Sequence, residues 1–282
     1  MEMEAYPPVT EVILSIAFES QQCLVGPQLL MTLRDLTAQY SQVEERSPYE
    51  MPQEFPTENQ LIRPAGPTFR IIGPSAVPQQ RYWLTDPSND SILLQVQSNY
   101  LAINWRKTKN SSVYPGFKEL LASFKKIFKN MQNSAIGNGG AELKIQQAEI
   151  SYINIIRPDA LWSTHKDIAK VLKVTSPVLT DVEQLNMAYT KPLRDSSGDF
   201  VGRLRSAVET GYATRQEDIP INEVVYADLV PIINITTSVR STMFGQPDID
   251  SALGFFDHAH DEAGKSFHSL ASEAALENWG LK

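Results

Sequence analysis

The stretch ILLQVQSNYLAINWRK, residues 92–107, constrains the fold most, because its apolar residues alternate as they do in two consecutive β-strands. Ser98 and Asn99 are typical of a two-residue turn, which would pair residue 97 with residue 100 and residue 92 with residue 105. One face of this hairpin would then be apolar and consist of Ile92, Leu94, Val96, Leu101, Ile103 and Trp105. The opposite face would carry Gln95, Gln97, Asn104, Tyr100, Ala102 and Leu93. The register therefore predicts that the amides are gathered on one face of the hairpin.

Similar patterns recur along the chain. Period-2 alternation or short apolar runs predict strands at residues 9–19, 69–72, 81–85, 144–157, 199–209 and 222–238, the last interrupted or bent at Pro231. Apolar residues at helical spacing predict helices at residues 27–40, 115–131, 164–174 and 248–279. Runs of adjacent strands argue against a doubly wound parallel sheet. We therefore predict an α+β fold with an antiparallel sheet.

The sequence GNGG, Gly137–Gly140, is the best candidate for an internal boundary. It lacks the lysine that a phosphate-binding loop needs, so we interpret it as a linker. It separates residues 1–136, with a Pro-rich excursion at 41–67, from residues 141–282, which end in a long helix. Both parts run from a long strand through helical material and antiparallel strands to an amphipathic helix. We predict two topologically similar halves, each an antiparallel sheet packed on a helix. The alternative is one large curved sheet wrapped on the C-terminal helix.

Charge and composition narrow the choice of partner. The 282 residues include 25 Lys and Arg against 33 Asp and Glu, a formal net charge of -8. Nucleic-acid binding depends on clustered cations, so this acidic balance does not favour a nucleic-acid partner, although it does not exclude one. We expect a protein partner or a homo-oligomer. The single cysteine, Cys23, excludes an internal disulfide. With no apolar run long enough for a membrane span, we expect no membrane partner and a cytoplasmic protein.

Histidines near the C-terminus are the main candidates for chemistry. His258 and Glu262 are four residues apart and would share one face of a helix, which permits a metal-binding pair, but His260 would point away from His258. We therefore predict no metal site and no cofactor. The alternative interpretation is that one histidine packs against the sheet or bonds a neighbouring carbonyl group.

The amide-bearing strands are the second candidate. The residues predicted to bind a ligand are Gln95, Gln97, Tyr100, Asn104, Asn154 and Asn234. Buried amides need hydrogen-bond partners, so two interpretations stay open. In the first, the amides pair across the sheet or tie down the Pro-rich excursion. In the second, they line a groove that recognises a peptide strand, a nucleotide or a single-stranded nucleic acid.

Five motifs occur in order along the chain: YPPVTEVILSIAFE, RYWL, LLQVQSNYLAINWRK followed by YPGF, EISYINII, and FDHAHDEAGKSFHSLASEAALENWG. In this order the sequence resembles a sporadically distributed bacterial family of uncharacterised proteins of similar size. The resemblance implies no established activity. It matches His260 and Asp261 to the family's usual His-acid step, and the family's patchy occurrence is similar to that of accessory genes in defence or mobile-element regions.

Two classes of function follow. We favour a non-catalytic macromolecule-binding or scaffold protein, such as an accessory or regulatory subunit. The alternative is a hydrolase or nucleic-acid-processing enzyme that uses the C-terminal helix, with His260 and Asp261 as candidate catalytic residues.

Overall fold

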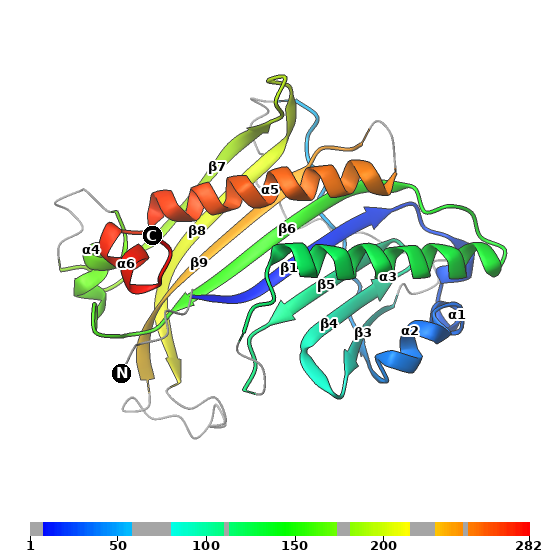
Figure 1. The fold of residues 1–282 in the computed structure, drawn as a ribbon, viewed down its shortest axis with the longest axis horizontal. Coiled ribbons are helices and arrows are strands. Elements are labelled where there is room, and N and C mark those ends of the chain that lie inside the picture. The colour runs from blue at the N-terminus through cyan, green and yellow to red at the C-terminus, as the bar shows by residue number, and fades with distance from the viewer. Residues whose placement is uncertain (1–7, 58–79, 110–112, 174–180, 215–228, 245–247) are drawn as a thin grey trace, which may run out of the picture.

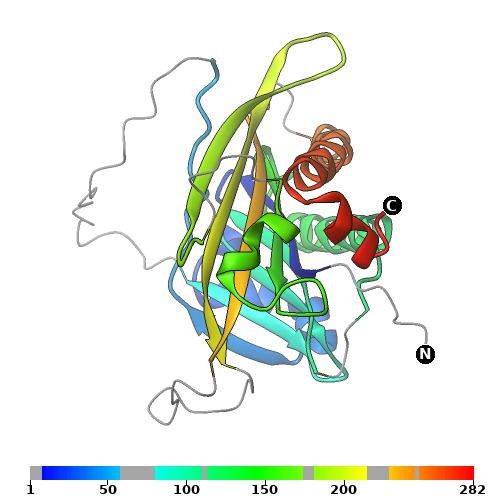
Figure 2. The ribbon, with the colours of Figure 1, turned by 90° about the vertical axis from the view of Figure 1, so that its left-hand side faces the viewer.

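A nine-stranded antiparallel sheet covered on one face by two long helices forms the body of the protein (Figures 1 and 2). This computed structural model describes residues 8–57, 80–109, 113–173, 181–214, 229–244 and 248–282. The strands are β1 (Val9–Phe18), β2 (Gln42–Arg46), β3 (Arg81–Asp86), β4 (Asn89–Gln97), β5 (Tyr100–Arg106), β6 (Ile145–Ile156), β7 (Asn186–Arg194), β8 (Phe200–Thr214) and β9 (Leu229–Ser241). The helices are η1 (Gln22–Leu24), α1 (Pro27–Thr32), α2 (Arg34–Gln39), α3 (Phe117–Gly137), η2 (His165–Asp167), α4 (Ile168–Val171), α5 (Ile249–Leu270) and α6 (Glu273–Asn278). The predicted α+β class is confirmed.

The sheet is continuous, with the strand order β2-β3-β4-β5-β1-β6-β9-β8-β7. The first strand of the chain, β1, lies near the centre between β5 and β6, and Ser15 on β1 faces Ala102 on β5 and Glu149 on β6. The helix α3 follows β5 in the chain and α5 follows β9, and both lie on the same face of the sheet (Figure 2). One sheet therefore unites the described parts of the chain, while its division into two similar halves stays a prediction.

The predicted hairpin register is confirmed pair by pair. β4 and β5 pair residue 92 with 105, 94 with 103, 95 with 102 and 97 with 100. The apolar face is buried, and Trp105 on it is only 1% exposed. Because side chains alternate between faces, the amides are placed on the face that the helices do not cover.

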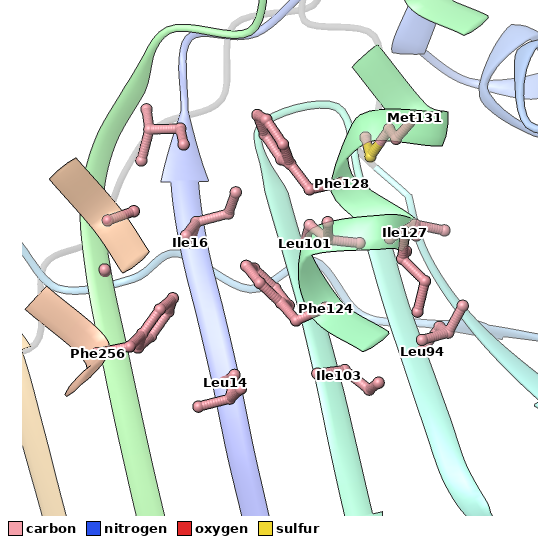
Figure 3. Packing of buried hydrophobic residues seen from close by; sticks show 14 of the residues in the cluster. Leu14, Ile16, Leu94, Leu101, Ile103, Phe124, Ile127, Phe128, Met131 and Phe256 are labelled. Atoms are coloured by element: carbon pink, nitrogen blue, oxygen red, sulfur yellow. The ribbon is translucent and has the colours of Figure 1, made fainter. Parts of the chain in front are cut away.

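A hydrophobic core fills the space between the sheet and the helices (Figure 3). Phe124, Phe128 and Met131 of α3 recur at helical spacing, so they share the face that packs on Leu101 and its neighbours. Phe124 also meets Phe256 of α5 edge-on, with ring centroids 5.5 Å apart. The two long helices thus share one core.

Several predicted boundaries change in the structure. The helix predicted at residues 27–40 is divided into α1 and α2 at Leu33. The long C-terminal helix ends at Leu270, Ala271 then pairs with Leu172, and the Ser272 side chain caps α6. The break after Leu270 coincides with the Leu172–Ala271 bridge, a tertiary contact that helical periodicity does not report.

Two edge strands were not predicted. Every residue of β2 is exposed, and β7 exposes all but two residues and contains a proline, so neither shows the alternation of a half-buried strand. β9 continues through Pro231. The strand predicted at residues 69–72 lies outside the described residues.

Among the residues that the structure describes, no helix combines the length and apolarity needed to cross a membrane.

Candidate functional site

The sheet face opposite the helices is crossed by residues 47–57, which we call the strap segment (Figure 2). Its first anchor is Tyr49, whose backbone N–H donates to Gln97 Oε1 at 2.9 Å while its carbonyl oxygen accepts from Gln97 Nε2 at 3.0 Å. The Tyr49 ring packs edge-on against Tyr100 at 5.0 Å. The buried Gln97 side chain thus forms hydrogen bonds with both backbone groups of an extended residue, as the backbone of a neighbouring strand would.

The second anchor is Glu54, whose carboxylate is buried against β8. It forms ion pairs with Arg203 and, at 2.7 Å, with Arg205. Arg203 also donates to the carbonyl oxygens of Phe55, at 3.1 Å, and Thr57, at 2.7 Å. Glu54 is 3% exposed and Arg203 is 6% exposed, so the pair is shielded from water. A guanidinium with several acceptors around it is a stable partner for a buried carboxylate.

The remaining amides on this face form a hydrogen-bonded chain across four strands. Arg81 on β3 donates to Gln95 Oε1 at 2.9 Å, Gln95 donates to Asn104 Oδ1 at 2.9 Å, and Asn104 donates to Glu11 Oε1 on β1 at 2.6 Å. Gln95 and Asn104 therefore pair across the sheet, while Gln97 bonds the Pro-rich excursion at Tyr49. They use their hydrogen bonds within the chain.

The six predicted binding residues do not form one site. Gln95, Gln97, Tyr100 and Asn104 share the face crossed by the strap segment. Asn154 instead lines a pocket beneath α5, and its Nδ2 donates to the Ile235 carbonyl oxygen at 3.2 Å. Asn234 Oδ1 is buried and has no hydrogen-bond partner among the described residues.

His260 faces the sheet from α5. Its Nδ1 and the Tyr152 hydroxyl lie 2.6 Å apart in a hydrogen bond, and its ring stacks on Phe117 with centroids 4.1 Å apart. Burial lowers the pKa of His260 below its ordinary value, and Lys118 lowers it further, while Asp261 and Asp257 oppose the shift. The ring is therefore neutral at pH 7.

The other acidic and histidine side chains of α5 do not gather around His260. Asp261 is exposed and forms no hydrogen bond or ion pair with His260 within the described part of α5. His258 Nε2 donates to the Arg194 carbonyl oxygen at 2.7 Å, and Glu262 pairs with Lys265. In the part of the chain described, no group of three or more metal-ligating side chains is close enough to hold a metal ion.

Protonation of His260 is expected to destabilise the fold. The pKa of His260 in the folded protein lies below its unfolded value of about 6.5, so the unfolded chain binds the proton first as the pH falls. The contribution of neutral His260 to the free energy of unfolding is therefore complete above about pH 6.5. It is lost as the pH falls toward the folded-state pKa. The free energy of unfolding should therefore fall between pH 7.5 and pH 5.5 by more in the wild type than in His260→Gln. Chemical denaturation at both pH values measures this difference, and equal slopes would contradict it.

Sequence patterns did not single out Glu54 or Arg203. Glu54 lies in a Pro-rich stretch of polar residues, 149 positions from Arg203. The available signal was weak: Arg203 and Arg205 alternate with apolar residues in GRLRSAV, so two arginines share one face of a predicted strand. Their common partner is visible only in the fold.

Comparison with known proteins finds no family model that matches the sequence, and no curated protein or solved structure is significantly similar to it.

Proposed function

We propose that this chain is a non-catalytic binding protein, an accessory or regulatory subunit, whose open sheet face holds an extended acidic segment of a partner protein. In the isolated chain the strap segment occupies that face. A partner segment would replace it by making the same bonds.

The strongest support is the way in which the face holds the strap segment. Gln97 contacts the strap segment through both backbone groups of Tyr49 and also donates to Asn99 Oδ1 at 2.7 Å. Arg203 bonds the backbone of Phe55 and Thr57. Backbone bonds of this kind do not depend on side-chain identity, as in other sheet surfaces that bind peptides. Two side-chain contacts add to these bonds: the Tyr49 ring against Tyr100 and, five residues later, the Glu54 carboxylate between Arg203 and Arg205.

Local charge supports an acidic ligand. The whole chain is acidic, with a formal net charge of -8, yet Arg203, Arg205, Arg240 and Arg81 lie on this one face. Arg240 is balanced by Glu149, while Arg203 and Arg205 depend on Glu54 of the strap segment. Displacing the strap segment would expose two arginines that need a new carboxylate.

A labelled peptide with the sequence of residues 47–57, SPYEMPQEFPT, tests this proposal. We expect saturable binding to the Glu54→Ala protein, in which the strap segment is weakened, and at least tenfold weaker binding to the wild type, whose own segment competes. A peptide with glutamine at the Glu54 position should bind the Glu54→Ala protein at least tenfold more weakly. Fluorescence anisotropy measures the affinity of each of these three peptide–protein pairs.

Two results would overturn the proposal. One is the absence of peptide binding by a folded Glu54→Ala protein, and the other is equal binding of the glutamate and glutamine peptides. A partner that copurifies with the protein would support the proposal only if an excess of the 47–57 peptide releases it.

The alternative enzyme hypothesis depends on His260. In the described structure His260 bonds Tyr152 and not an acid, so the His-acid step does not form the dyad that a hydrolase of this kind would use. The geometry therefore favours the binding protein.

A further inference from the structure

A second site lies on the opposite side of the sheet, in the pocket that contains His260. The pocket has a volume of about 240 Å³ and is formed between α5 and the strands β6 and β9, beside the start of β1. Its walls include Val9, Tyr114, Tyr152, Asn154, His260 and Phe267. Their side chains are mainly aromatic and apolar, which is typical of a small-molecule site.

None of these lining residues is an acid, a lysine or an arginine. Burial raises the pKa of Tyr114 and of Tyr152, so both phenols keep their protons, and the lowered pKa of His260 keeps its ring neutral. A charged ligand would lose its hydration here without an acid, a lysine or an arginine in the lining to pair with it, which is unfavourable. The pocket therefore selects against ions.

His260 provides the polar contact. Its Nδ1 is used by Tyr152, and Nε2 has no hydrogen bond to any residue that the structure describes. The Phe117 ring stacks on the imidazole and holds its plane. Which proton the ring carries depends on the tautomer, and a ligand hydroxyl group, which both donates and accepts, pairs with Nε2 in either state.

The volume sets the size of the ligand. An apolar cavity of about 150 Å³ holds one benzene molecule, so about 240 Å³ is enough for a substituted ring or two fused rings. We propose that this pocket binds a small uncharged aromatic molecule that carries one hydroxyl group. This site is separate from the strap-segment face and does not depend on it.

Gly264 offers a way to close the pocket without disturbing the sheet. It lies on α5 in the pocket wall, and a Cβ atom at this position meets nothing within 4 Å. Gly264→Leu is therefore expected to fill the pocket while the helix is retained. Gly254→Leu is the matched control, because Gly254 is also on α5 with open space at its Cβ but lines a different pocket.

The test uses 2-naphthol and, as the charged probe of similar shape, 2-naphthoate, at pH 7.5 with the full chain. By saturation-transfer NMR and titration calorimetry, 2-naphthol should bind saturably to the wild type and to Gly254→Leu, and at least tenfold more weakly to Gly264→Leu. Binding of 2-naphthoate should be at least tenfold weaker than that of 2-naphthol. Circular dichroism checks that each variant is folded.

Three results would overturn the proposal: no binding of 2-naphthol to the folded wild type, binding unchanged in folded Gly264→Leu, or equal binding of the neutral and charged probes. If Gly264→Leu does not fold, His260→Phe replaces it. That variant keeps a ring to stack on Phe117 but has no Nε2, so unchanged 2-naphthol binding would equally overturn the role of His260.

Discussion

Replacing Glu54 with alanine is expected to reduce the free energy of unfolding by about 3–5 kcal/mol, because it leaves the buried Arg203 guanidinium without its carboxylate. The cost is set by the buried charge that remains and not by the attraction that is lost. Glu54→Gln keeps an oxygen acceptor and should cost less than Glu54→Ala. Urea denaturation of the wild type, Glu54→Ala and Glu54→Gln measures the free energy of unfolding of each.

Detachment of the strap segment is the second readout for this variant. The Tyr49 amide is protected by its bond to Gln97 Oε1, so its hydrogen exchange reports whether the segment lies on the sheet. Exchange should be at least tenfold faster in Glu54→Ala than in the wild type. Gln53→Ala is the matched control, since Gln53 is an exposed neighbour on the same segment. Unchanged stability and unchanged exchange in Glu54→Ala would contradict the buried anchor.

Phe124→Ala is expected to reduce the free energy of unfolding by a similar amount, about 3–5 kcal/mol, because it leaves a large cavity in the core. Phe124 is fully buried in α3 and touches Phe256 of α5 (Figure 3). Urea denaturation is again the measurement. Ile136→Ala on the same helix is the control, since Ile136 is 45% exposed, and it should change stability by much less.

The same experiment bears on the division of the chain into halves. The core cluster that contains Phe124 includes residues from both sides of the Gly137–Gly140 boundary, such as Leu14 on β1, Val239 on β9 and Phe256. If the cluster unfolds as one unit, far-ultraviolet circular dichroism and tryptophan fluorescence should give the same single transition in the wild type and in Phe124→Ala. Two separate unfolding transitions, of which only one shifts to lower urea concentration in Phe124→Ala, would instead favour independent halves.

The two proposed sites lie on opposite faces of one sheet, and their chemistry differs. The strap-segment face presents buried amides and arginines, which hold the backbone and one carboxylate of an extended segment. The His260 pocket presents mainly aromatic and apolar side chains, with His260 Nε2 as the polar contact of the proposed site. Tyr152 belongs to β6 and Arg240 to β9, strands that pair side by side, so both faces depend on the same central strands.

The sequence by itself determined the local pattern. The strands β4 and β5 were predicted with their register, because alternation has a period of two and a two-residue turn allows only one pairing. The segregation of Gln95, Gln97 and Asn104 from the apolar residues followed from that register. The helix α3 was predicted from its apolar stripe, although it continues to Gly137, beyond the predicted end at residue 131.

Only the tertiary structure decided which distant groups meet. The strap segment is held on the sheet by the contact between Glu54 and Arg203, which are 149 positions apart. The His260 pocket depends on the contact between His260 and Tyr152, which are 108 positions apart. Strand and helix periodicity reports which face of an element is buried, but it does not report what lies against that face. The reason is physical: long-range contacts are formed by the packing of the whole sheet, so a local sequence pattern specifies the elements and leaves their partners open.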